Sequence, residues 1–106
     1  MAHLLLDENL PRLLLKHLAP HTGKTVQQMR WSGTKNGRLL ERASPEFDAL
    51  VTIDQGLRFQ QNLRNFDIGV ILLDAPSNRP EDVVPLAPGI IDAAYVVGRG
   101  ELVVVS

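Results

Sequence analysis

Two acidic positions in this chain each end a short run of apolar residues. Residues 4–6 lead into Asp7 and Glu8, and residues 49–53 lead into Asp54. If both runs are neighbouring parallel strands, their carboxylates meet at the sheet edge where open α/β proteins bind ligands. Strands lie roughly 4.8 Å apart, so two such carboxylates could share one divalent cation through their oxygens. The pattern therefore favours a metal or phosphate site.

The elements that would position these residues alternate along the chain. Continuous apolar runs predict strands over residues 4–6, 49–53, 69–73 and 101–105, with a weaker strand at 25–29. Helical spacing predicts helices over residues 10–18, 36–43 and 80–97, the last one broken by prolines. This order predicts an α/β domain with a mostly parallel five-stranded sheet, in strand order 2-1-3-4-5.

Composition limits the number of domains and the classes of protein. A chain of 106 residues with 44% hydrophobic content supports one core, which predicts a single domain over residues 1–106. No cysteine is present, which excludes disulfide scaffolds and thiolate metal sites. No apolar run reaches membrane-spanning length and the N-terminus turns acidic early, so we expect a cytoplasmic protein without a membrane partner.

Positive charge is concentrated in one stretch although the formal net charge is -1. Residues 24–42 hold five basic residues and one acidic residue, a local charge of +4. Arg30, Lys35 and Arg38, together with the later Arg58, are candidates for phosphate contacts. Surface cations commonly only solvate a helix face, so that alternative stays open for each of them.

Several residues near the acids are candidates for supporting roles. The Thr52 hydroxyl could hold a carboxylate, although threonine is also simply a good strand former. Glu8 could join the two aspartates or face water. Asn9 and Asn36 are expected to cap the helices that follow them. Asp74 also ends a strand, but that strand lies two positions from the first one, which favours a loop role.

Further side chains could face a substrate or could belong to the core. Trp31 could stack on a base, but a lone tryptophan is more often a core residue. Gln60, Gln61 and Asn62 follow Arg58 and could also face the substrate. His17 and His21 have the spacing of a zinc pair, yet Pro20 interrupts the helix between them, so we interpret them as surface or partly buried histidines.

Three segments of the chain read LLLDENLPRLLLKHL, TVQQMRWSGTKNGRLLERA and FDALVTIDQGL. They resemble the compact PIN-like domains of bacteria, which are related to the VapC-type nucleases and are often described as the toxins of toxin-antitoxin pairs. The resemblance implies a three-layer α/β/α sandwich that binds Mg²⁺ or Mn²⁺ and cleaves RNA as an endoribonuclease. It implies metal ligation by Asp7 and Asp54, with Glu8 as a third catalytic acid. It also implies a small antitoxin as partner.

One departure from the PIN-like pattern leaves other functions open. Related domains often carry an acid where this chain has Asn36, and an uncharged amide weakens a cation site. A catalytically weak or inactive binding module is therefore one alternative. A receiver-like phosphoacceptor is another, but the residues expected at the ends of its fourth and fifth strands are replaced by Asp74 and Ser106. The apolar segment 102–105 could be an edge strand that pairs two copies as a homodimer.

Overall fold

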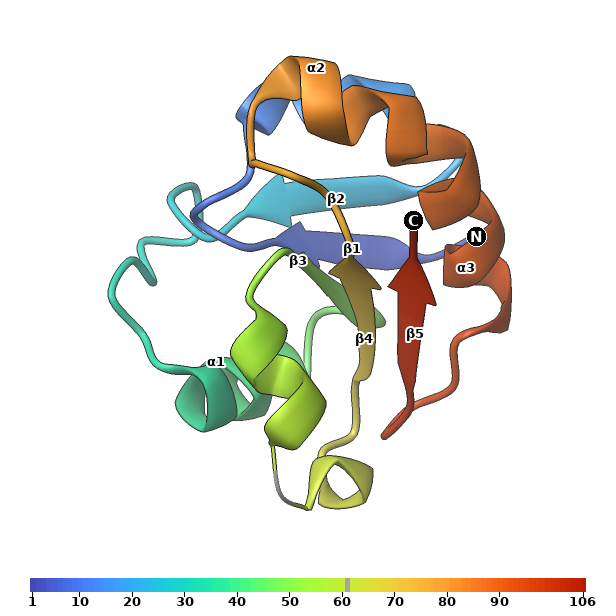
Figure 1. The fold of residues 1–106 in the computed structure, drawn as a ribbon. Coiled ribbons are helices and arrows are strands. Elements are labelled where there is room, and N and C mark those ends of the chain that lie inside the picture. The colour runs from blue at the N-terminus through green and yellow to red at the C-terminus, as the bar shows by residue number, and fades with distance from the viewer. Residues whose placement is uncertain (61) are drawn as a thin grey trace.

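The chain forms one sheet of five strands, all parallel, in the order β2-β1-β3-β4-β5 (Figure 1). The computed structural model describes residues 1–60 and 62–106. The strands are β1 (His3–Leu6), β2 (Thr22–Thr25), β3 (Ala49–Thr52), β4 (Gly69–Leu73) and β5 (Leu102–Val105). The predicted α/β class and strand order are confirmed, including the adjacency of β1 and β3.

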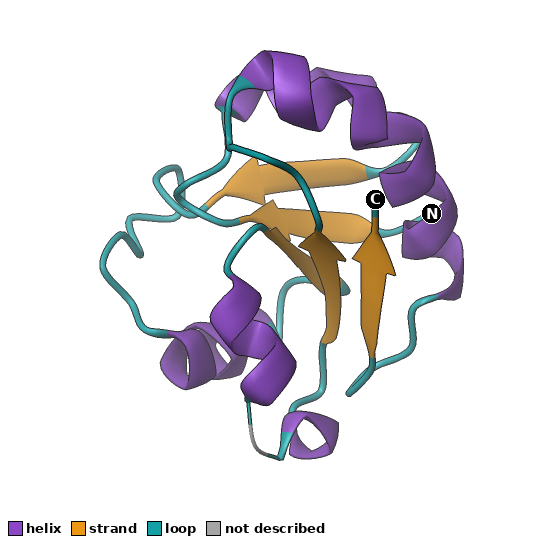
Figure 2. Cartoon of the chain, viewed as in Figure 1, coloured by secondary structure: helices purple, strands orange, loops and turns teal. Residues whose placement is uncertain are grey.

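Short helices connect the strands (Figure 2). The α-helices are α1 (Asn36–Ala43), α2 (Pro80–Val83) and α3 (Ala87–Val96), and the 3-10 helices are η1 (Arg12–His17), η2 (Gln55–Phe59), η3 (Leu63–Asn65) and η4 (Val84–Leu86). The expected break in the last helical region is present as η4. None of the helices in the described part of the chain is long and apolar enough to cross a bilayer.

The alternation of side chains along each strand divides the core into two clusters, one on each face of the sheet. Leu4 and Leu6 of β1 pack in a cluster with residues of η1, α2 and α3. Leu5, between them, packs in a second cluster with residues of α1 and η2. Because a parallel sheet buries both faces, the three central strands read as nearly continuous apolar runs. Their polar side chains are therefore confined to the strand ends.

The second strand lies three residues earlier than predicted, and the segment predicted as strand is a turn. The backbone N–H of Thr25 donates to Gln28 Oε1 over 2.8 Å, and the N–H of Gln28 donates to Thr25 Oγ1 over 3.1 Å. The Met29 N–H also donates to the Thr25 carbonyl. The predicted strand over residues 25–29 was wrong because these polar side chains bond to the local backbone and close a turn.

Two predicted helix caps were also wrong. The first helix begins after Pro11 as a 3-10 helix, while Asn9 lies outside it and accepts a hydrogen bond from Asn78 through its carbonyl. In α1 the capping position is Lys35, which makes no side-chain cap, and Asn36 is the first helical residue. A helix boundary can lie one or two residues away from the best local capping residue, because neighbouring positions differ little in local propensity.

A buried histidine joins three segments that are distant in the sequence. The Ala2 N–H donates to His21 Nδ1 over 2.8 Å, and His21 Nε2 lies 3.1 Å from the Ile91 carbonyl of α3. An acceptor at Nδ1 requires the proton at Nε2, so the neutral ring donates to Ile91. The ring of Tyr95 packs against it, with 4.5 Å between ring centroids. This residue therefore connects the start of β1 to α3 and is structural.

Replacing His21 with leucine should destabilise the fold. The substitution leaves the Ala2 N–H and the Ile91 carbonyl without this partner, which should lower the free energy of unfolding by about 1–3 kcal/mol. Urea denaturation measures the change. The matched control is His17→Leu, because His17 is exposed, and it should shift stability by no more than about 0.5 kcal/mol. Equal stability of the two variants would contradict the structural role.

Candidate functional site

The carboxylate of Asp7 lies at the carboxyl end of β1, where the strand meets β3. Its backbone N–H donates to the Val51 carbonyl over 2.9 Å, which continues the β1–β3 ladder by one residue. The side chain is only 8% exposed. Oδ1 accepts a hydrogen bond from the Glu8 N–H over 2.8 Å. The backbone of the sheet and of the following turn therefore fixes Asp7, as expected for a residue directly after a strand.

Thr52, the last residue of β3, connects the two aspartates. Its side chain is 0% exposed, and its hydroxyl donates to Asp7 Oδ2 over 2.6 Å. The same hydroxyl oxygen accepts the backbone N–H of Asp54 over 3.0 Å. Of the two roles considered for Thr52, the structure therefore shows the carboxylate-holding one. The Thr52 side chain therefore links Asp7 and Asp54 at the same edge of the sheet.

Asp54 begins the turn that follows β3. It is the N-terminal cap of η2, and its Oδ1 accepts the Gly56 N–H over 2.9 Å. A Cβ at position 56 would stand 3.1 Å from that oxygen and 3.6 Å from the side-chain nitrogen of Asn36. Glycine therefore lets the carboxylate and the start of α1 approach each other. Asn36 lies beside Gly56 in the turn of Asp54, although it does not cap its helix.

The electrostatic state of Asp7 is unusual for an aspartate. Burial is the largest effect and raises the pKa of its carboxyl above the ordinary value of 3.8, while hydrogen bonds from Thr52 and Glu8 oppose the rise. The nearby charges of Asp54 and Glu8 raise this pKa further. Within residues 1–60 and 62–106, no lysine, arginine or histidine forms a salt bridge with Asp7. A buried carboxylate without a cationic partner is a functional-site candidate.

Glu8 points toward a neighbouring loop. Its Oε1 accepts the Gly33 N–H over 3.0 Å, and its carbonyl accepts a bond from Gln27 Nε2 over 2.7 Å. These contacts tie the loop before α1 to the acidic edge. Asn9, another proposed supporting residue, is exposed and contributes its carbonyl to Asn78.

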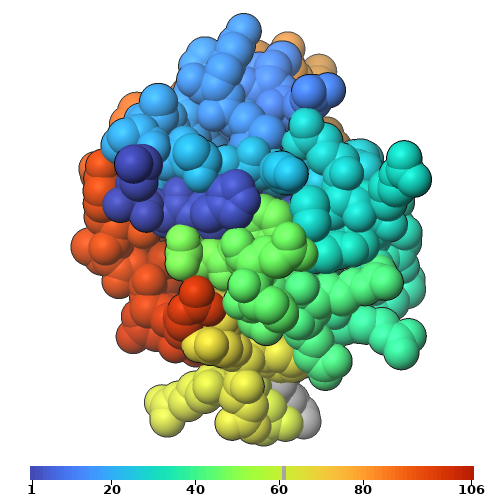
Figure 3. Space-filling model, turned by 180° about the vertical axis from the view of Figure 1, so that it is seen from behind, coloured from blue at the N-terminus to red at the C-terminus, as the bar shows by residue number. Residues whose placement is uncertain are grey.

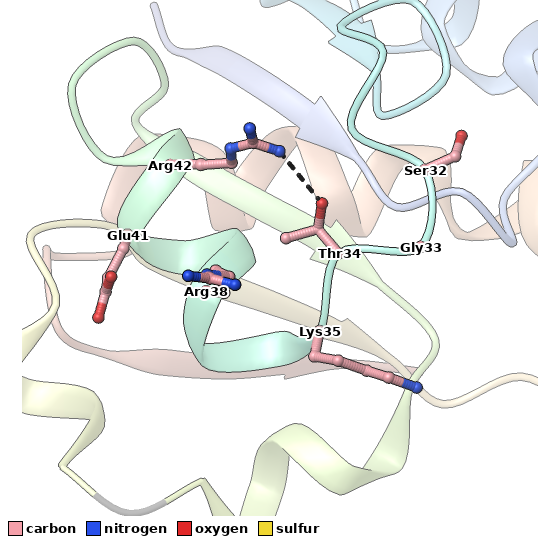
Figure 4. Close-up of a pocket in the computed structure, with 7 residues that line it drawn as sticks. All are labelled: Ser32, Gly33, Thr34, Lys35, Arg38, Glu41 and Arg42. Carbon is pink, nitrogen blue, oxygen red and sulfur yellow. Dashed lines mark hydrogen bonds between the residues drawn. The ribbon is translucent and has the colours of Figure 1, made fainter.

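The basic candidates separate into two groups. Lys35 and Arg38 line a groove of about 730 Å³ beside α1 (Figure 4). Arg30 is exposed in the preceding turn at a φ of 62°, and Arg58 in η2 donates to Gln55 Oε1. Neither of these lines the groove. Arg42 does line it and was not singled out from the sequence, although its helical spacing from Arg38 was the signal available.

Trp31 belongs to the core side of this region. It packs against the cluster beneath α1, and its ring lies edge-on to Phe47 with 6.2 Å between centroids. The Arg42 guanidinium lies over the same ring, with 5.7 Å from its central carbon to the ring centroid. Of the two roles considered for Trp31, packing is therefore the one the structure shows. Gln61, proposed to face the substrate, lies outside the described residues.

The donors at the acidic edge fit a cation that completes its coordination elsewhere. Each carboxylate oxygen has about two lone-pair sites, so Asp7 retains acceptor capacity beyond its two hydrogen bonds. Over the described ranges, no group of three or more His, Asp and Glu side chains is arranged to hold a metal. Mg²⁺ commonly uses one or two carboxylates together with water and phosphate oxygens. The residues present suit that mode, and they do not form an all-protein cage.

Replacing Asp7 with asparagine should change the pH dependence of stability when no divalent cation is present. Because the pKa of Asp7 is raised in the folded protein, the native protein binds more protons than the unfolded chain at pH values between 3.8 and the folded pKa. The contribution of Asp7 to stability is therefore fully present below pH 3.8 and is lost as the pH rises through the folded pKa. The neutral amide of Asp7→Asn avoids the cost of burying a charge, but its nitrogen cannot accept one of the two hydrogen bonds that the carboxylate accepts from Thr52 and Glu8. The melting temperature of the variant relative to the wild type should therefore rise as the pH rises from acid to neutral.

Thermal melts across this pH range in EDTA check the expectation. Asp74→Asn is the matched control, because Asp74 is exposed at the end of the neighbouring strand β4. If the difference in melting temperature between Asp7→Asn and the wild type does not change with pH, then ionised Asp7 carries no stability cost.

The chain matches no protein-family model, no curated protein and no solved structure. A functional assignment therefore depends on the geometry of the acidic edge and on the residues around it.

Proposed function

We propose that this protein is a metal-dependent endoribonuclease of the PIN-like type, with Asp7 and Asp54 at its centre. The observation that carries the proposal is the buried Asp7 carboxylate, which has no cationic partner among the described residues and adjoins a second acid. Such an arrangement costs stability unless a ligand compensates for it. A divalent cation is the ligand that paired carboxylates suit best.

In this proposal the protein residues hold and orient the ligands of the site. Asp7 and Asp54 would each contribute carboxylate oxygen to Mg²⁺ or Mn²⁺. Thr52 fixes the rotamer of Asp7 and the backbone of Asp54 at once, which limits the motion of both donors. When bound, a divalent cation acidifies water for attack on phosphorus and stabilises the departing oxygen. No nucleophilic side chain is required.

The helices on both faces of the sheet support a three-layer α/β/α arrangement of PIN-like type as part of the proposal. The toxin role, with RNA as substrate and a small antitoxin as partner, belongs to the same proposal. The edge position of β5 supports a homodimer formed through that strand. Gel filtration that gives a monomer mass at micromolar concentration would remove the dimer from the proposal.

A catalytically inactive binding module is the second candidate. The observation that favours it is the small acidic set, in which Asn36 takes the place of a further charge beside Asp54 in the described part of the chain. A receiver-like role has less support, because β4 is followed by the exposed Asp74 and β5 is followed by Ser106. Turnover in a defined assay separates the first two candidates.

Replacing Asp54 with asparagine should abolish Mn²⁺-dependent cleavage of RNA. The isosteric amide keeps the turn but removes a charge from the cation site, so the rate should fall by about 100-fold or more. Asp74→Asn is the matched control and should retain the wild-type rate, because Asp74 is exposed on the next strand.

Calorimetric titration with Mn²⁺ gives a second readout that does not depend on activity. Wild-type protein should bind the ion, and Asp7→Asn should not. Wild-type protein that binds Mn²⁺ but never cleaves RNA would favour the binding module. Cleavage that survives in Asp54→Asn, or that proceeds equally in EDTA, would contradict the proposed chemistry.

A further inference from the structure

A groove on the surface of α1 lies next to the acidic edge and is separate from it. It is lined by Ser32, Gly33, Thr34, Lys35, Arg38, Glu41 and Arg42, and it encloses about 730 Å³ (Figure 4). Sites for small ligands commonly measure about 300–1,000 Å³. The groove is therefore large enough for part of a chain-like ligand and open enough for that chain to continue beyond it.

The lining is predominantly positive. The lining residues include three cations, Lys35, Arg38 and Arg42, and one carboxylate, that of Glu41. No salt bridge to any of these cations is present in the described part of the chain. In Figure 4 the Glu41 side chain extends away from the Arg42 guanidinium, which points toward Thr34. The three positive charges are thus available to an anionic ligand.

One wall of the groove is held in place by the core. Arg42 donates to Thr34 Oγ1 over 3.4 Å and lies over the Trp31 ring. The Thr34 hydroxyl donates to the Trp31 carbonyl over 2.5 Å, and Trp31 packs on Phe47. A cation positioned before binding loses less side-chain entropy on binding. Arg42 is therefore more than a freely solvated surface charge.

One hydrogen bond and one sequence neighbour connect the groove to the candidate metal site. Gly33 of the groove donates its N–H to Glu8, the residue after Asp7. Lys35 of the groove directly precedes Asn36, which lies beside the turn of Asp54 and Gly56. In Figure 3 the loop before α1 and α1 itself form one continuous teal-to-green surface. A ligand that spans both regions would pass from the acids to the cations along one side of the molecule.

We propose that this groove binds the phosphodiester backbone of single-stranded RNA on one side of the bond that is hydrolysed. The inference rests on the proposed function, because it places the scissile phosphate at Asp7 and Asp54. The groove exposes no large apolar side chain among its lining residues. Protein partners usually bury aromatic or aliphatic anchors, whereas backbone phosphates need only charge and hydrogen-bond donors.

The spacing of the cations suits successive phosphates. Arg38 and Arg42 are four residues apart on α1, a rise of about 6 Å along the helix. Arginine presents forked donors that match phosphate oxygens, and lysine adds a point charge. None of these contacts reads a base, so we expect little sequence preference from the groove.

The test is binding of a labelled single-stranded RNA of about ten nucleotides, measured by fluorescence anisotropy in EDTA so that no cleavage occurs. The double variant Lys35→Gln and Arg38→Gln should bind about tenfold more weakly than the wild type. Each lost phosphate contact lowers the slope of log affinity against log salt by about 0.7, so the slope should fall by about 1.4. Both residues are exposed, so the fold should be unaffected.

Arg64→Gln is the matched control, because Arg64 is an exposed arginine in η3, outside the groove, and it makes no salt bridge to a described residue. It should bind RNA as the wild type does. Equal affinities of the double variant and this control would overturn the inference. Tighter binding of an RNA duplex of the same length than of the single strand would also overturn the inference. Tighter binding of a polyglutamate peptide of equal charge would overturn it as well, and would assign the groove to an acidic protein segment.

The two proposals fail in different ways. If the wild-type protein binds RNA through these cations but does not cleave it with Mn²⁺, the groove proposal stands and the nuclease proposal fails. If the wild-type protein cleaves RNA but the double variant keeps the wild-type affinity and KM, the nuclease proposal stands and the groove proposal fails. Asp54→Asn should bind RNA at least as tightly as the wild type, because it removes a negative charge near the path.

Discussion

The hydrogen bond from Thr52 to Asp7 sets the arrangement of the whole acidic edge. It lies at the end of β1 and β3, the two strands between which the winding of the sheet reverses. A parallel sheet covered on both faces has its polar groups at the strand ends, where ligands are bound. Thr52 holds the Asp7 carboxylate in a buried position and orients the backbone of Asp54. Without this bond, the buried carboxylate would lose one of its two hydrogen bonds, and the two acids would no longer share a partner.

Holding a carboxylate there is costly in the absence of a ligand. Burial and two neighbouring acids raise the pKa of Asp7, and no described cation forms a salt bridge with it. Proteins usually place aspartates at strand ends as exposed turn residues, as this chain does with Asp74. Asp7 is buried and Asp74 is exposed, although both follow strands. This difference in burial marks Asp7 as the candidate functional residue and Asp74 as a structural one.

Much of the architecture could be predicted from the pattern of apolar residues. The runs at residues 4–6 and 69–73 are strands because an uninterrupted apolar run can be buried on both sides, and the strand order followed from the handedness of the crossovers. The segment 25–29 could not be predicted in this way, because Gln28 bonds to the Thr25 backbone and closes a turn. A side chain that competes for nearby backbone groups leaves no periodic signal.

The amino-acid pattern alone was sufficient to place Asp7 and Asp54 after two neighbouring strands, because strand positions buried on both faces reject charge and the acids must follow them. The role of each surrounding residue came instead from the packing of the folded chain. Glu8 bonds to Gly33 and Trp31 packs on Phe47, while Arg42 contacts Thr34 at the wall of the groove. Such outcomes depend on how segments are brought together in space, and a local pattern carries no information about which partner will be within reach.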